Sequence, residues 1–109
     1  MKWLIQNKIY GLLGIAMKAG KVTFGTDSCL ENIEKKKIKL VLVAEDASER
    51  NKRHFEEKCK KNEIPYFVFG DTEHISKAIG KNNKTVIGIH DKNFAGAIQK
   101  VLNGGDVIG

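Results

Sequence analysis

The chain has 109 residues, of which 41% are hydrophobic and 29% charged, and this balance is typical of one soluble domain with a single core. No apolar run approaches the roughly 20 residues that span a bilayer. Residues 1–20 carry polar breaks and no small-residue cleavage pattern, which disfavours a secretory signal. We therefore expect a single domain over residues 1–109, located in the cytoplasm and without a membrane partner.

A net charge of +6 and an isoelectric point near 9.4 favour a polyanionic partner. All of the 19 basic residues except Arg50 and Arg53 are lysines. Lysine contacts phosphate as a point charge, whereas arginine provides the bidentate fork that reads base edges. The composition thus predicts contact with a nucleic-acid backbone more than base recognition by charged groups. A lysine-rich surface that only keeps the protein soluble is the alternative that charge alone leaves open.

The first half of the chain predicts two helices and two strands. An apolar stripe at helical spacing indicates a helix over residues 4–19, and Gly20 suits the left-handed position after its end. Residues 22–24 are expected as a very short strand, followed by a second helix over residues 27–37. The continuous apolar run at residues 40–44 is typical of a strand buried on both faces.

The second half predicts three helices and two strands in alternation, each helix opened by a residue that caps well. In order, these elements are a helix from Ser48 to about residue 61, a strand at residues 66–69, a short helix from Asp71 to Gly80, a strand at residues 85–90, and a helix from Asp91 that ends at residues 103–105. Because helices and strands alternate, we expect an α/β fold, a three-layer α/β/α sandwich around a small sheet. Ligands of such folds gather at loops next to strand ends.

The start of the second helix is the main candidate binding site. Gly25 is followed by Thr26, Asp27 and Ser28, small or polar residues at a point where a helix presents free N–H groups. Such a helix end attracts anions and phosphates. A helix that is simply well capped, with Ser28 and Glu31 at capping-box spacing, is the alternative.

Cations and amides elsewhere in the sequence extend this candidate surface. Lys18 and Lys21 are expected beside the helix start, and Lys35 and Lys36 carry positive charge along the same helix. A polar loop after the fourth helix offers side chains for phosphates and base edges: Lys81, Asn82, Asn83 and Lys84. An ordinary polar turn is the alternative for this loop, and periodicity does not say whether it folds near the helix start.

Few residues in the sequence could support catalysis or hold a metal. Glu45 and Asp46 follow the buried strand, where paired carboxylates can bind Mg²⁺, but no nucleophile, phosphate loop or third acid accompanies them. Cys29 and Cys59 are expected as buried, reduced thiols, because the three histidines show no zinc-type spacing with them. We expect no enzyme activity, cofactor, metal or small-molecule substrate. A small metal-dependent enzyme using Glu45 and Asp46 stays open as an alternative.

Three segments resemble a known family, and they read LLGIAMKAGKVTFGTD, KLVLVAEDAS and IPYFVFGDTEHISKAIGK. Over residues 9–102 the chain is similar to the large-subunit ribosomal proteins that bind kink-turn RNA, the L-seven-Ae and L-thirty-e group, and especially to its small bacterial members. The resemblance implies a mixed four-stranded sheet. It also implies that the second helix start and the loop after the fourth helix lie side by side and grip the bend of a kink-turn. The helix start would enter the groove beside the sheared G·A pairs, and the loop would cover an extruded base.

The helix start departs from the family pattern, which is Gly, any residue, Asn, Glu, two further residues and Lys. Gly25 matches, whereas Asp27, Ser28 and Glu31 stand where Asn, Glu and Lys are usual. Ionised Asp27 lacks a donor, Ser28 has a shorter reach, and Glu31 would repel a nearby phosphate. These departures bear on kink-turn selectivity more than on RNA binding itself.

The sequence and the resemblance together predict a non-enzymatic RNA-binding protein. We expect a monomer that binds structured RNA and is associated with the ribosome. A protein-interaction module of a ribosome or transcription complex, using the charged helix that follows Ser48, is the second hypothesis.

Overall fold

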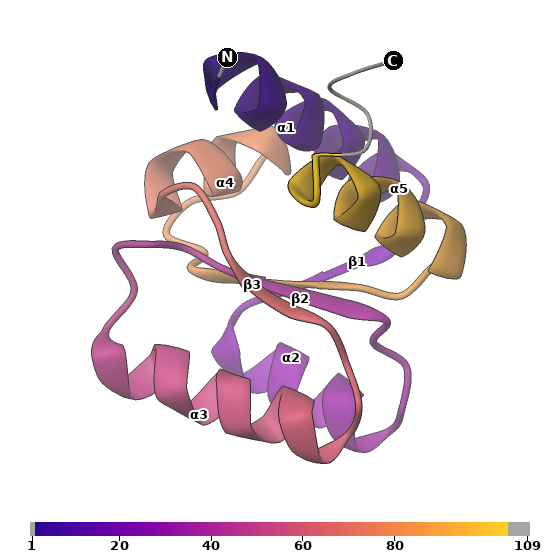
Figure 1. Ribbon diagram of the computed structural model, residues 1–109. Helices are drawn as coiled ribbons and strands as arrows, with labels where there is room; N and C mark the ends of the chain where they lie inside the picture. Colours follow the sequence, from indigo (N-terminus) through magenta and orange to yellow (C-terminus); the bar gives the residue numbers. More distant parts are fainter. Residues whose placement is uncertain (1, 105–109) are drawn as a thin grey trace.

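The computed structural model describes residues 2–104 and has three layers (Figure 1). One face of the sheet is covered by α1 (Lys2–Lys18), α4 (Thr72–Ala78) and α5 (Lys92–Leu102), and the other by α2 (Thr26–Glu34) and α3 (Glu49–Lys61). The predicted three-layer α/β/α sandwich is therefore confirmed. No helix within the described residues is long and apolar enough to cross a membrane. The expected last-helix end at residue 105 lies outside the described residues.

The sheet has four strands in the order β1-β4-β2-β3. They are β1 (Val22–Phe24), β2 (Leu40–Val43), β3 (Tyr66–Val68) and β4 (Val86–Ile89). Strand β4 runs antiparallel to β1 and β2, whereas β2 and β3 are parallel, so the sheet is mixed, as the family resemblance implies. The two central strands, β2 and β4, are buried throughout, which explains why their sequences are apolar without alternation.

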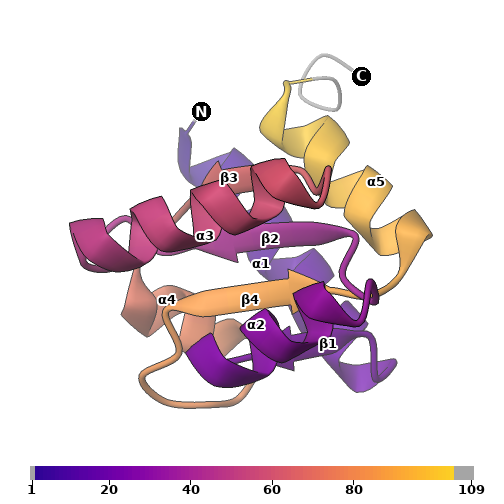
Figure 2. The same cartoon turned by 90° about the horizontal axis from the view of Figure 1, so that it is seen from below.

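The strand directions give the sheet two distinct ends. At one end the Gly25 amide donates to the Val86 carbonyl over 3.0 Å; at the other the His90 amide donates to the Lys21 carbonyl over 2.9 Å. We call these the Gly25 end and the His90 end. Helices α2 and α3 both begin at the Gly25 end and finish at the His90 end, as Figure 2 shows.

Each face of the sheet has its own hydrophobic core. One cluster lies under α1, α4 and α5, and the other joins α2 and α3 to the sheet through Phe55, Cys29 and Cys59, all fully buried. Both cysteines are free, and burial raises the pKa of each thiol to about 12. The prediction of buried, reduced cysteines is confirmed.

The structure confirms the predicted starts of three helices, whereas the predicted end of α2 is wrong. Ser48, Asp71 and Asp91 cap α3, α4 and α5, each side chain accepting a backbone N–H three residues on. Helix α2 ends at Glu34 and not at residue 37, because Lys36 takes a left-handed φ of 59° that stops the helical repeat.

Candidate nucleic-acid interface

Helix α2 begins without a side-chain cap. Gly25 is its N-cap residue, with φ 92° and ψ 152°, a conformation open essentially to glycine alone. No side chain caps the helix start, and the Cys29 amide donates to the Gly25 carbonyl over 3.0 Å. The capping box of Ser28 and Glu31 is therefore absent. The amides of residues 26–28 remain available at the positive end of the helix.

The side chains at this helix start are open to solvent. Asp27 and Ser28 are exposed, and Thr26 is half-buried. Glu31, one turn further on, forms an ion pair with Lys35 over 2.8 Å, and this hydrogen bond lowers the pKa of Glu31. A neighbouring cation thus partly offsets the repulsion that Glu31 would exert on a phosphate.

The polar loop at residues 81–84 packs against the same end. The Nζ atoms of Lys81 and Lys84 lie 5.1 and 5.6 Å from the ring centroid of Phe24, the residue before Gly25. The loop is fixed by Ser76 of α4, whose hydroxyl accepts from the Lys84 amide over 2.8 Å and donates to the Lys84 carbonyl. The structure thus brings the loop and the α2 start together, an adjacency that the resemblance implied.

Asn82 and Asn83 are exposed at the turn of this loop. An open hollow lies between the loop and the start of α4, lined by Asp46, Thr72, Glu73, Ser76, Lys77, Gly80, Lys81, Asn82 and Asn83. The loop and Lys77 of α4 contribute amide and ammonium donors to this lining, whereas Asp46 and Glu73 contribute carboxylates. The two carboxylates repel a phosphate from their part of the hollow.

Four of the predicted lysines lie at the His90 end instead. Lys21 precedes β1, so the strand separates it from Gly25 by about 13 Å. Lys18 ends α1 near Lys21, and Lys35 and Lys36 follow the last turn of α2, about 15 Å from its start. The expectation that Lys18 and Lys21 flank the helix start is wrong, because β1 runs away from them before α2 begins.

The two acidic residues after β2 make structural contacts, Asp46 through its carboxylate and Glu45 through its backbone amide. Asp46 Oδ1 accepts from the backbone amide of Thr72 over 2.9 Å and from its hydroxyl over 2.7 Å, and these bonds lower the pKa of Asp46. The Glu45 amide donates to the Gly70 carbonyl. No group of three or more His, Cys, Asp or Glu side chains within residues 2–104 is placed to hold a metal ion. These contacts favour loop and helix-start bonding over the metal-enzyme alternative.

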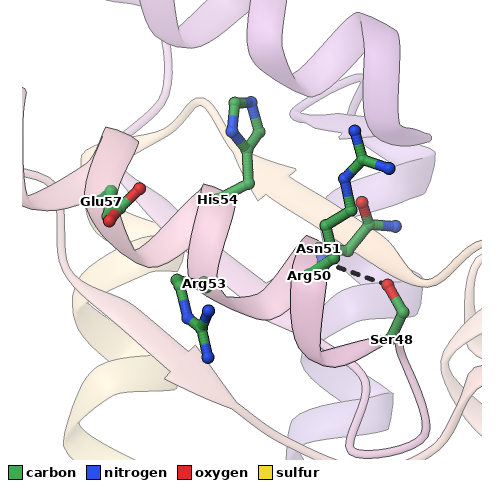
Figure 3. A pocket seen from close by; sticks show the side chains of 6 residues that line it. All are labelled: Ser48, Arg50, Asn51, Arg53, His54 and Glu57. Atoms are coloured by element: carbon green, nitrogen blue, oxygen red, sulfur yellow. Dashed lines mark hydrogen bonds between the residues drawn. The ribbon is translucent and has the colours of Figure 1, made fainter.

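The outer face of α3 carries both arginines of the chain, together with a shallow hollow (Figure 3). Arg50 and His54 extend to one side of the helix, whereas Arg53 extends to the other. The Ser48 hydroxyl is used as the helix cap and accepts from the Asn51 amide over 3.1 Å. The arginines therefore do not converge on one ligand position.

Sequence reasoning missed one contact at the His90 end. The Thr23 hydroxyl and His90 Nε2 form a hydrogen bond between β1 and the residue that follows β4. Burial lowers the pKa of His90, and the positive charges of Lys37 and Lys21 act in the same direction. No local signal joins Thr23 to His90, because the pairing of β1 with β4 brings them together.

We expect protonation of His90 to lower the free energy of unfolding as the solution is acidified. Because the native pKa of His90 lies below its ordinary value of 6.5, the unfolded chain takes up the proton first. Its stabilising contribution is complete above pH 6.5 and is lost as the pH falls through the native pKa. Urea unfolding at pH 7.5 and pH 5.0 should show a larger loss for the wild type than for His90→Gln. Equal losses in the two proteins would contradict this expectation.

Three layers, this strand order and an uncapped glycine-led helix beside a polar loop define the class of this chain, an α/β/α sandwich protein. The model of the ribosomal protein L7Ae/L30e/S12e/Gadd45 family matches residues 7–98. The chain belongs to this family.

Two bacterial relatives match nearly the whole chain. The RNA-binding protein YlxQ of Enterococcus faecium is 36% identical over 99 residues, which are 91% of this chain and 95% of the relative. The RNA-binding protein YlxQ of Bacillus subtilis (strain 168) is 32% identical over 94 residues, which are 86% of this chain and 94% of the relative. These similarities agree with the small bacterial type that the sequence motifs resemble.

Solved structures share the fold. A protein of unknown function from Bacillus halodurans aligns with a TM-score of 0.86 and 28% identity, over 88% of this chain and 97% of that chain. The 15.5kD RNA binding protein of Giardia lamblia aligns with a TM-score of 0.77 and 16% identity, over 96% of this chain and 90% of that chain. At that identity the second likeness concerns the fold alone.

Proposed function

We propose that this chain is a non-enzymatic, cytoplasmic RNA-binding protein that binds structured RNA of the kink-turn type and associates with the ribosome. It acts as a single-domain monomer. The adjacency of the uncapped α2 start and the loop at residues 81–84 carries the proposal, because together they offer backbone donors, cations and amides on one surface. Family membership and the two relatives named as RNA-binding proteins support RNA as the partner.

The α2 start supplies the donors in this proposal. The amides of residues 26–28 donate to a phosphate or a base edge, and the positive end of the helix dipole strengthens these bonds. Gly25 lacks a Cβ, and no heavy atom lies within 4 Å of the position that a Cβ would take. The RNA backbone can therefore approach the helix closely. Thr26 and Ser28 add hydroxyl contacts, whereas Asp27 only accepts.

The loop supplies the cations. Lys81 and Lys84 neutralise phosphates, and the amides of Asn82 and Asn83 contact base edges or sugars. Lys18, Lys21, Lys35 and Lys36 lie more than a Debye length from Gly25 at physiological salt, so they add little to binding there. Four lysines acting together would give a salt slope of about −3 to −4, whereas the two loop lysines give about −2.

The departures from the family pattern give the test of selectivity. The wild type is expected to prefer a kink-turn RNA over a straight duplex of equal length. The triple variant Asp27→Asn, Ser28→Glu, Glu31→Lys restores a donor, a longer reach and a cation, and we expect it to increase that preference roughly tenfold. Fluorescence anisotropy titrations with both RNAs measure the ratio of affinities.

The single variant Glu31→Gln is the control for this triple variant. It breaks the pair with Lys35 without adding a cation, so it should leave the preference close to that of the wild type. If the triple variant bound the two RNAs with the same ratio as the wild type, residues 27, 28 and 31 would not determine selectivity. Equal affinity of both RNAs for the Gly25 end, measured by competition for that site, would contradict kink-turn recognition.

A further inference from the structure

The His90 end of the molecule concentrates positive charge from three segments. Three segments lie at this end: the turn between α2 and β2, the last turn of α3, and the turn between α1 and β1. Their lysines are Lys35, Lys36, Lys37 and Lys39; Lys58, Lys60 and Lys61; and Lys18 and Lys21. The site at the Gly25 end uses none of them.

Electrostatic contacts join these lysines into one surface. Glu34 pairs with Lys58, and the charges of Lys61 and Lys36 also lower the pKa of Glu34. A hollow at the end of α3 is lined by Lys36 and Lys39 together with Ile33, Ile38 and residues 62–64. Lys37 and Lys21 both act on His90, which continues the surface toward β1.

The protein neutralises only part of this charge. Seven lysines of the α2–β2 turn and the α3 end (35, 36, 37, 39, 58, 60 and 61) meet three glutamates, Glu31, Glu34 and Glu63. Two of those glutamates are paired with Lys35 and Lys58. The C-terminal ends of α2 and α3 add about half a negative charge each. A surplus of about three positive charges remains on these segments, held at the cost of mutual repulsion.

Five lysines of this end form what we call the lysine cluster. Within residues 2–104 none of them makes an ion pair, and all are exposed: Lys36, Lys37, Lys39, Lys60 and Lys61. Because all five members are lysines, the cluster lacks the guanidinium fork with which arginine reads base edges. Its chemistry therefore suits phosphates and not particular bases.

We propose that the lysine cluster binds the phosphate backbone of a second RNA segment, a duplex stem, while the Gly25 end holds the first. The inference rests on the proposed function for the class of partner. Lys36, the cluster lysine that follows α2, lies about 15 Å from the start of that helix, which exceeds the Debye length at physiological salt. The protein thus joins two RNA segments, one by shape and one by charge alone.

Three matched double variants test the second surface. Lys37→Gln with Lys39→Gln removes two charges from the cluster, Lys81→Gln with Lys84→Gln removes two from the loop, and Lys8→Gln with Lys100→Gln removes two from the α1–α5 layer. The probes are a kink-turn RNA with a donor fluorophore and a straight RNA duplex with an acceptor. Energy transfer between the probes reports binding of both to one protein molecule.

The wild type is expected to produce energy transfer with one kink-turn RNA and one duplex per protein. The cluster variant should bind the kink-turn RNA as the wild type does but bind the duplex roughly tenfold more weakly. Duplex binding should have a salt slope of about −4 in the wild type and about −2 to −3 in the cluster variant. The variant Lys8→Gln with Lys100→Gln should bind both RNAs with the affinities and salt slopes of the wild type.

The outcomes separate the two proposals. Binding of the kink-turn RNA without the duplex at any duplex concentration would overturn the second surface. Duplex binding that is equally tight in the cluster variant and the wild type would also overturn it. If the wild type failed to bind the kink-turn RNA while the duplex bound through the cluster, the proposed function at the Gly25 end would fall instead.

Discussion

Replacing Gly25 by alanine is expected to lower the free energy of unfolding by about 1–3 kcal/mol and to weaken binding of kink-turn RNA. Gly25 has φ 92° and ψ 152°, and no atom lies within 4 Å of the position that a Cβ would take. The cost therefore arises from backbone strain and not from a collision. Relief of that strain would shift the first turn of α2 and change its position relative to the loop at residues 81–84.

Gly96→Ala is the matched control for this substitution. Gly96 lies in α5, and a Cβ there also meets nothing within 4 Å. Because alanine is a better helix former, Gly96→Ala should raise the free energy of unfolding by about 0.5–1 kcal/mol and leave RNA affinity unchanged. Urea unfolding and anisotropy titrations measure both variants. A Gly25→Ala protein as stable as the wild type would show that the helix start tolerates a side chain.

Removing both loop cations is expected to weaken kink-turn binding roughly tenfold or more, since each lysine is proposed to contact a phosphate. In Lys81→Gln with Lys84→Gln, the salt slope should fall from about −2 toward zero. The free energy of unfolding should change by no more than about 1–2 kcal/mol, because only the partly exposed contacts of the two ammonium groups with the Phe24 ring are lost.

Titrations of a labelled kink-turn RNA between 50 and 200 mM salt give both the affinity and the slope. The variant Lys8→Gln with Lys100→Gln has the same net charge and serves as the control. If that control lost as much affinity as the loop variant, overall charge and not the loop would govern binding. An unchanged slope in the loop variant would mean that Lys81 and Lys84 do not contact phosphates.

Local chemistry made the helix starts predictable. Ser48, Asp71 and Asp91 accept from backbone amides three residues on, within one turn of chain, so the sequence contains the whole interaction. The buried strands were predictable for a related reason, since an apolar run such as residues 40–44 is stable only between two covered faces. The end of α2 was not, because the left-handed conformation of Lys36 belongs to the turn that leads into β2.

The arrangement of the site depends on contacts between distant parts of the chain. Phe24, next to Gly25, meets the loop at residues 81–84 because β1 pairs with β4, a choice of partner that residue spacing does not specify. The same pairing carries Lys21 to the opposite end of the sheet and places His90 against Thr23. Family resemblance supplied the first of these consequences. Neither resemblance nor periodicity supplied the placement of the lysines.

The central claim is that the α2 start and the loop at residues 81–84 form one RNA-binding surface. Amide NMR spectra recorded while a kink-turn RNA is added test it residue by residue. We expect the largest changes in chemical shift at residues 25–28 and 81–84, saturating together at one RNA per protein. Changes confined to the lysine cluster or to the α1–α5 layer, with residues 25–28 unaffected, would contradict the account.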